Sequence, residues 1–225
     1  MPVHIDGHSV LVFFHALLFG YWLGADLGVF FCDSQLTRDD LDIEERLRVR
    51  RIRYKVDMAP RTCLVLILAV GFTLALRFGS PADGIWLVLI WAACLAWLAL
   101  IWAARLQGGT ARGRTLSRID RGVWFLVGAV MIGAGSYALA TGELFAGQWL
   151  AIKVLLFGVI TWNGIWIMRV GDRWDPLFEA VRAGGAETAL AEQEMKVNRR
   201  RAATAAGVLW FLVLVMAFMG TVKPI

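Results

Sequence analysis

The sequence predicts an all-α integral membrane protein, a bundle of about six transmembrane helices, and two observations support that prediction. Of the 225 residues, 59% are hydrophobic and only 18% are charged, whereas about 25% of the residues of a typical soluble domain are charged. A soluble protein this apolar would have too little polar surface to cover its side chains. In addition, six apolar segments approach or reach the roughly 20 residues that a helix needs to cross the hydrocarbon core.

The expected spans follow one another with no internal repeat and no separate soluble domain, so residues 1–225 are expected to form a single transmembrane domain. The fourth span is the weakest because it contains several glycines, but glycine is favoured where transmembrane helices pack closely. These glycines are Gly128, Gly133 and Gly135. The spans run over residues 9–31, 58–76, 85–104, 123–140, 149–168 and 203–220.

The loops between the spans predict the orientation of the chain. Twenty basic residues lie within or at the edge of the segments that join the first and second, third and fourth, and fifth and sixth spans, while the other side has only Arg77 and Lys223. By the positive-inside rule, both termini then face away from the cytoplasm, which in the inner membrane of a bacterium means the periplasm. The net charge of +5 is thus explained by topology, and we expect no nucleic-acid partner. The N-terminus also lacks the basic region of a cleavable signal peptide, so the first span is expected to remain in the protein.

Two of the arginine-rich loops are expected to contain helices that lie against the membrane surface. In residues 33–57, Thr37 and Asp40 have the spacing of a capping box, and Leu41, Leu47 and Ile52 could contact the membrane while arginines face lipid headgroups. In residues 171–202, short helices are expected to break at Gly184 and Gly185. The three cysteines have no metal-binding spacing and are interpreted as small buried hydrophobes without disulfides: Cys32, Cys63 and Cys94.

Polar side chains within the first span would raise the free energy if they faced lipid, so they are expected to face the bundle interior or a functional site. The three histidines, His4, His8 and His15, all lie at its outer end. At 100° per residue, His15 points within about 20° of the direction of His8, and Asp26 points within about 20° of the direction of His15. Trp22 lies on the same face of the helix. A second face clusters small residues in a GxxxG pattern that suits close helix contact: Gly20, Gly24 and Gly28.

His15 lies about 10 Å into the span, where a neutral imidazole can be an axial ligand of haem iron or a ligand of copper. The alternative is a histidine hydrogen-bonded to a neighbouring helix. His4 and His8 have the i, i+4 spacing of a metal site at the N-terminus, although short polar segments also contain such residues by accident.

Lys153 is the second expensive residue, about one turn into the fifth span and in the same leaflet as His15. It either extends to the outer headgroups or pairs with an anionic group in a cavity, such as a porphyrin propionate or a substrate carboxylate. Four further polar residues lie at a similar depth on the cytoplasmic side and are interpreted as a structural ion-pair network: Asp26, Asp57, Arg61 and Asn163.

Three features together resemble the superfamily of small membrane proteins that includes HemJ, the membrane protoporphyrinogen oxidase, and the CopD copper-resistance proteins. The first is His15 followed by a small-residue and acidic stretch. The second is an arginine-rich acidic loop that leads to Met58 and Pro60 at a helix start. The third is a later helix that opens with Trp149 and Lys153. The match covers about half the chain and depends on order and spacing.

This resemblance implies a haem-b-binding oxidoreductase of the inner membrane in which His15 is the haem ligand and Lys153 is needed for activity. His8 and Met58 are further cofactor-binding candidates, and a porphyrinogen or a quinone is the expected partner. Because every histidine is in or before one helix, the chain cannot form a bis-histidine cytochrome, and one iron position would be open or weakly bound. The chain departs from HemJ in its two extra spans, and from CopD in its lack of a dense Met/His ladder.

Two other functions stay open. A copper-handling permease would use His4, His8 and His15 as a relay of ligands, although soft copper(I) would prefer sulfur ligands nearby. A non-catalytic membrane subunit would need no cofactor and would contact lipid, itself or a partner through Gly20, Gly24 and Gly28. Metal content separates the three functions.

Overall fold

The computed structural model describes residues 6–224 and is a bundle of α-helices, without strands in that range. His4, one of the predicted metal ligands, lies outside the described residues. Six helical stretches are long and apolar enough to cross a membrane, which confirms the predicted all-α membrane bundle. The elements are α1 (Gly7–Gln35), α2 (Ile43–Val56), α3 (Met58–Ala75), η1 (Leu76–Phe78), α4 (Gly84–Leu106), α5 (Ala111–Thr141), α6 (Gln148–Gly171), α7 (Trp174–Ala183) and α8 (Thr188–Val222).

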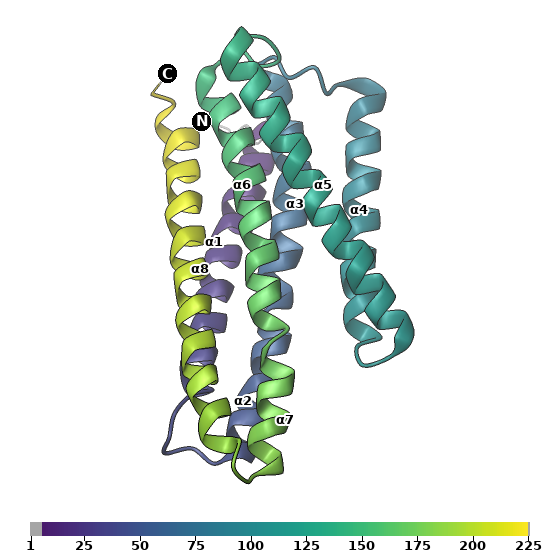
Figure 1. Cartoon of the computed structure of the whole chain (residues 1–225). Coiled ribbons are helices and arrows are strands. Elements are labelled where there is room, and N and C mark those ends of the chain that lie inside the picture. Colours follow the sequence, from purple (N-terminus) through teal and green to yellow (C-terminus); the bar gives the residue numbers. More distant parts are fainter. Residues whose placement is uncertain (1–5, 225) are drawn as a thin grey trace.

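Four helices, α1, α3, α6 and α8, form one part of the bundle, and α5 packs along α6 (Figure 1). Helix α4 contacts α3 and α5 and lies at the margin of the molecule. Both ends of the described chain lie at one end of the bundle, whereas α2, α7 and the start of α8 lie at the other. That second end contains the arginine-rich loops, so the predicted charge asymmetry corresponds to two physically distinct ends of the bundle.

The bundle buries a core of aromatic and aliphatic side chains and exposes many others. Trp22, Val65 and Ile160 are almost fully buried in this core. On the outside, Phe13 and Phe211 have exposed fractions of 62% and 67%. An exposed surface of this kind suits contact with lipid tails, which solvate apolar side chains. The three cysteines are free, with Cys63 and Cys94 buried, as the sequence predicted.

The closest helix contact joins α5 to α6 and depends on glycine. A Cβ atom added at Gly135 would lie 2.6 Å from the backbone nitrogen of Leu155, and one at Gly158 would lie 2.7 Å from the carbonyl oxygen of Gly128. Neither distance is possible for a real side chain, so these positions must lack one. The glycines that weakened the fourth predicted span therefore let α5 approach α6 closely.

The structure corrects the prediction for the first arginine-rich loop. Helix α2 is capped by Asp42, which accepts a hydrogen bond from the Glu45 amide at 2.8 Å, and not by a Thr37–Asp40 capping box. Asp40 instead pairs with Arg38. A single residue, Asp57, separates α2 from α3, so α2 continues the line of the span and does not lie flat on the membrane.

The arginine-rich end is a helical extension with its own core. Leu36, Trp174, Phe178 and Met195 are buried there, with Leu47 packed against them, whereas Ile52 is half exposed. Helix α8 has 35 residues and is thus about 52 Å long at 1.5 Å per residue, far longer than the roughly 30 Å hydrocarbon core. Its excess length belongs to this extension.

Ion pairs hold the extension together. Arg46 of α2 donates two hydrogen bonds to Glu192 of α8, at 2.9 and 2.6 Å, and Arg53 pairs with Asp33. The predicted break in the second loop is confirmed, because α7 ends at Ala183 and the next two residues are glycines with positive φ of 74° and 89°.

Replacing Gly135 with alanine is expected to lower the free energy of unfolding by about 1–3 kcal/mol, the usual cost of overpacking. The matched control is Gly133→Ala on the same helix, because a Cβ atom there meets nothing within 4 Å. Alanine is the better helix former, so the control should be neutral or slightly stabilising. Unfolding in detergent micelles measures both variants, and equal stability of the two would contradict the close α5–α6 contact.

Candidate functional site

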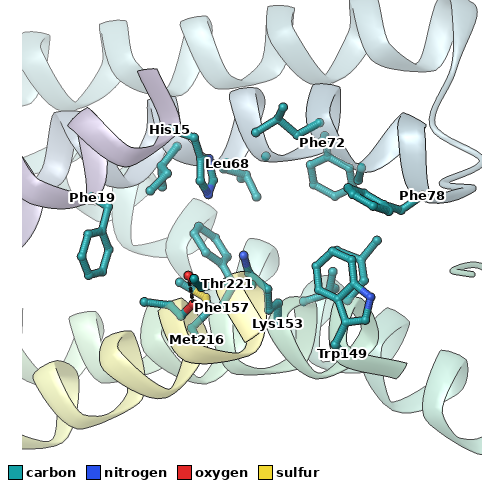
Figure 2. Close-up of a pocket in the computed structure, with 18 of the residues that line it drawn as sticks. His15, Phe19, Leu68, Phe72, Phe78, Trp149, Lys153, Phe157, Met216 and Thr221 are labelled. Atoms are coloured by element: carbon teal, nitrogen blue, oxygen red, sulfur yellow. Dashed lines mark hydrogen bonds between the residues drawn. The ribbon is translucent and has the colours of Figure 1, made fainter. Parts of the chain in front are cut away.

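A cavity of about 410 Å³ lies among α1, α3, α6 and α8, toward the end of the bundle where the described chain begins and ends. This volume is within the range of small-molecule and cofactor sites. Most of its lining is apolar, with Phe19, Leu68, Phe72 and Phe157 among the larger side chains (Figure 2). The polar groups that line it include His8, His15, Lys153 and Lys223. The cavity thus brings together the two residues that the sequence singled out, His15 and Lys153.

His15 projects from α1 into this cavity with a ring nitrogen toward the empty space (Figure 2). Its Nδ1 atom is buried and has no hydrogen-bond partner. On the α3 side the ring lies over Gly71, where an added Cβ would make an ordinary contact of 3.5 Å with Cε1. The alternative interpretation, a histidine hydrogen-bonded to a neighbouring helix, therefore finds no partner within residues 6–224. An unpaired imidazole at a cavity wall is free to bind a ligand or a metal.

Lys153 reaches the cavity from α6 and extends toward the wall that carries His15 (Figure 2). Its side chain passes over Gly220 of α8, where any Cβ atom would collide with the amine. The Nζ atom lies 6.0 Å from the centre of the Trp149 ring. Within residues 6–224, no carboxylate forms an ion pair with Lys153. A half-buried ammonium without a counter-ion favours binding of an anion.

Lys223 is a second cation of this cavity that the sequence did not identify as a site residue. Its Nζ atom lies 4.3 Å from the ring centre of Phe78 and 5.3 Å from that of Trp149. These two rings meet edge to face at 5.1 Å, so they form an aromatic wall that both lysines share. The sequence analysis counted Lys223 only as one of the few basic residues on its side of the membrane. No local sequence pattern relates Lys223 to Lys153, so the sequence did not identify it as a site residue.

Two methionines, Met131 of α5 and Met216 of α8, also line the cavity and place sulfur atoms around it. Met58, the methionine that the resemblance indicated, does not line it. That residue is buried in the core at the opposite end of α3. Methionine is a flexible apolar residue with no spacing rule of its own, so only the packing of distant helices could identify the two sulfurs.

At the N-terminal end of α1, His8 lines the cavity and Asp6 caps the helix. The Asp6 carboxylate accepts a hydrogen bond from the Ser9 amide at 2.7 Å, and hydrogen bonds from Ser9 lower the pKa of this carboxyl. In the part of the chain that the structure describes, no three His, Cys, Asp or Glu side chains converge as a metal site. His8 and His15 are the histidines that the structure places in the cavity.

The predicted polar network on the other side is divided into separate interactions. Asp57 accepts a hydrogen bond from Arg61 at 2.8 Å, and Asn163 donates one to the Ala205 carbonyl at 3.0 Å. Asp26 accepts one from the Trp210 indole at 2.7 Å. The first two anchor helix ends or helix pairs, as expected of structural polar groups.

The glycine face of α1 is used only in part within the chain. A Cβ atom at Gly28 would lie 3.3 Å from Val56, whereas Gly20 and Gly24 have open space around them. These two glycines are therefore accessible to lipid or to another helix.

Comparison with known proteins gives no relative from which a function could be transferred: no family model, no curated protein and no solved structure matches the chain. Its function is inferred from the cavity.

Proposed function

We propose that this protein is a haem-b-binding oxidoreductase of the bacterial inner membrane, with His15 as the axial ligand. The observation that supports this function is the unpaired imidazole of His15 on the wall of an apolar cavity, with the uncompensated ammonium of Lys153 extending from the facing wall. The resemblance to the superfamily of HemJ and CopD assigns the same two residues to the same roles.

The residues present fit haem b in their chemistry. The ring nitrogen of His15 is an iron ligand, the apolar walls suit a porphyrin, and the two lysines match the two propionates. Lys153 and Lys223 lie on the same Phe78–Trp149 wall, so both carboxylates would be bound at one side. Met131 and Met216 also line the cavity, so their thioether sulfurs are further groups that could contact the iron.

When bound, haem iron with one histidine supplies one-electron chemistry at an open or weakly held position. The protein's part is to bind, orient and exclude water. His15 would bind the iron, the lysines would pair with the carboxylates, and the aromatic and aliphatic walls would exclude water. A porphyrinogen or a quinone, both largely apolar, is the partner that such a membrane cavity suits.

Copper handling is the second candidate, and one observation favours it. His8, His15, Met131 and Met216 all line the same cavity, so sulfur accompanies the histidines in space even though none is near them in sequence. Copper(I) prefers this combination of thioether and imidazole. Iron with porphyrin in the purified protein supports the first function, and copper without porphyrin supports the second.

The test of the haem proposal is an absorption spectrum of the detergent-purified protein, oxidised and dithionite-reduced. Wild-type protein expressed with haem available is expected to show a Soret band, and His15→Ala is expected to lose or shift it. His8→Ala tests the other histidine of the cavity, seven residues earlier on the same face of α1, and should keep the band if His15 is the iron ligand. A folded wild-type protein without a Soret band would overturn the haem proposal.

The lysine pair predicts how carboxylates contribute to affinity. Iron-free protoporphyrin isolates this contribution, and Lys153→Gln and Lys223→Gln are each expected to weaken its binding about fivefold, since such an ion pair contributes about 1 kcal/mol. Fluorescence titration measures the affinity. Arg77→Gln, which removes a charge from the same side without lining the cavity, should change little. An equal effect of all three variants would contradict specific binding by the lysines.

The proposed orientation has both termini in the periplasm. Alkaline phosphatase fused after Ile225 is then expected to be active, because the enzyme folds only outside the cytoplasm, whereas a fusion after Gln107 is expected to be inactive. Green fluorescent protein at the same two positions should give the opposite pattern. Activity of the phosphatase only after Gln107 would reverse the orientation and place the cavity at the cytoplasmic side.

A further inference from the structure

A second, smaller cavity of about 40 Å³ lies next to the first along the same three helices. The first cavity is lined by Phe19, Leu68 and Phe157, and the second by Trp22, Leu64 and Ile160. On each of α1, α3 and α6 the second residue is three or four positions nearer the arginine-rich end. That offset is about one helical turn, or roughly 5 Å. The two cavities are therefore stacked along the bundle and separated by a thin apolar layer.

Asp26 lines the second cavity and has no cationic partner among the described residues. Its Oδ2 atom accepts a hydrogen bond from the neutral indole of Trp210 at 2.7 Å, and its Oδ1 atom has no hydrogen-bond partner. Two cations of this region are already paired, Arg61 with Asp57 and Arg53 with Asp33. Of the two acidic residues that line this cavity, Asp26 and Asp57, Asp26 is the one that no structural ion pair explains.

The charges near Asp26 offer its ionised form no free counter-ion. They come from Asp57, which joins α2 to α3, and from Arg61 of α3, Arg53 of α2 and Asp33 of α1, and they form two complete ion pairs. The residues of α6 and α8 that line the cavity, including Ile160 and Leu209, are uncharged. An ionised carboxylate with one neutral donor in so apolar a place is expensive, whereas a protonated carboxyl group is not.

We infer that Asp26 is a proton-binding site, which exchanges one proton with water in the second cavity and holds it about two helical turns along α1, roughly 10 Å, from Phe19 of the first cavity. A cavity of 40 Å³ has room for water, which needs about 10–15 Å³. A water molecule in the cavity relays the proton: it receives one from bulk solvent and gives one to Oδ1, so that it remains neutral, and Oδ2 keeps its bond to Trp210. No electron moves in this step, and the inference does not depend on haem binding.

The position of the site indicates its use. Asp57 and Arg61 line the second cavity on the side of the arginine-rich end, whereas the first cavity lies toward the opposite end. A proton held at Asp26 is therefore available between the two halves of the bundle. Chemistry that consumes or releases protons in the first cavity would draw on it.

The test is infrared spectroscopy of the whole protein in detergent, titrated with pH. The carbonyl stretching band of a protonated carboxyl group is expected to appear as pH falls, to shift in D₂O, and to be absent from Asp26→Asn. That variant is nearly isosteric, and its side-chain oxygen can still accept the Trp210 hydrogen bond. Asp120→Asn is the matched control: Asp120 also accepts an indole hydrogen bond, from Trp97 at 2.9 Å, but does not line the cavity. Asp120→Asn should leave in place the band that is absent from Asp26→Asn.

A second variant keeps the inference testable if Asp26→Asn does not fold. Trp210→Phe removes the hydrogen bond and leaves the carboxyl group, so the same band should persist at a higher frequency. If the titrating band persists in Asp26→Asn, or if its frequency is unchanged in Trp210→Phe, then Asp26 does not bind the proton and the inference is overturned.

Discussion

The structure depends on one constraint: polar side chains within a lipid-embedded helix must face the interior of the bundle. Helix α1 carries its polar residues along a single seam, and this seam fixes how the helix is rotated. His8 and His15 face the larger cavity, Asp26 faces the smaller one, and Trp22 is 2% exposed between them. Lipid cannot solvate these groups, so any other rotation of α1 would expose them to the hydrocarbon. Both cavities are consequences of that rotation.

The remaining helices form the other walls of the cavities that the polar face of α1 lines. The glycine contact between α5 and α6 holds α6 in place, and α6 carries Lys153 into the cavity. Helix α8 contributes Met216, Gly220 and the lysine that follows it. At the other end, the extension of α2, α7 and α8 is fixed by ion pairs such as Arg46–Glu192 and Arg53–Asp33. These pairs engage the local cations, which is why Asp26 has none.

Much of the fold was predictable because it follows from local physics. Hydrophobic length predicted the spans, and the helices contain every predicted range or match it within a residue. The predicted depth of His15 and Lys153 in one leaflet agrees with their place in one cavity. The sequence also predicted the break at Gly184, where only a flexible backbone can leave the helix.

The rest required tertiary contacts that have no local signal. The arginine pattern of residues 43–56 suits a surface helix, but packing against Trp174 and Phe178 places it upright at the end of α3. Likewise, the polar residues at similar depth were predicted to form one network, whereas the direction of each side chain divides them between separate partners. The indole of Trp210 satisfies Asp26 from 184 positions away, and no spacing rule relates two such residues.

In the proposed function, His15 is the one histidine that binds iron in this largely apolar cavity. Because the chain has only three histidines, selective labelling with ¹⁵N-histidine followed by pulsed electron paramagnetic resonance of the ferric protein tests it most directly. The account predicts strong coupling to the ring nitrogen of one histidine, lost when residue 15 is alanine. Coupling to two histidines, or to none in a haem-loaded protein, would contradict it.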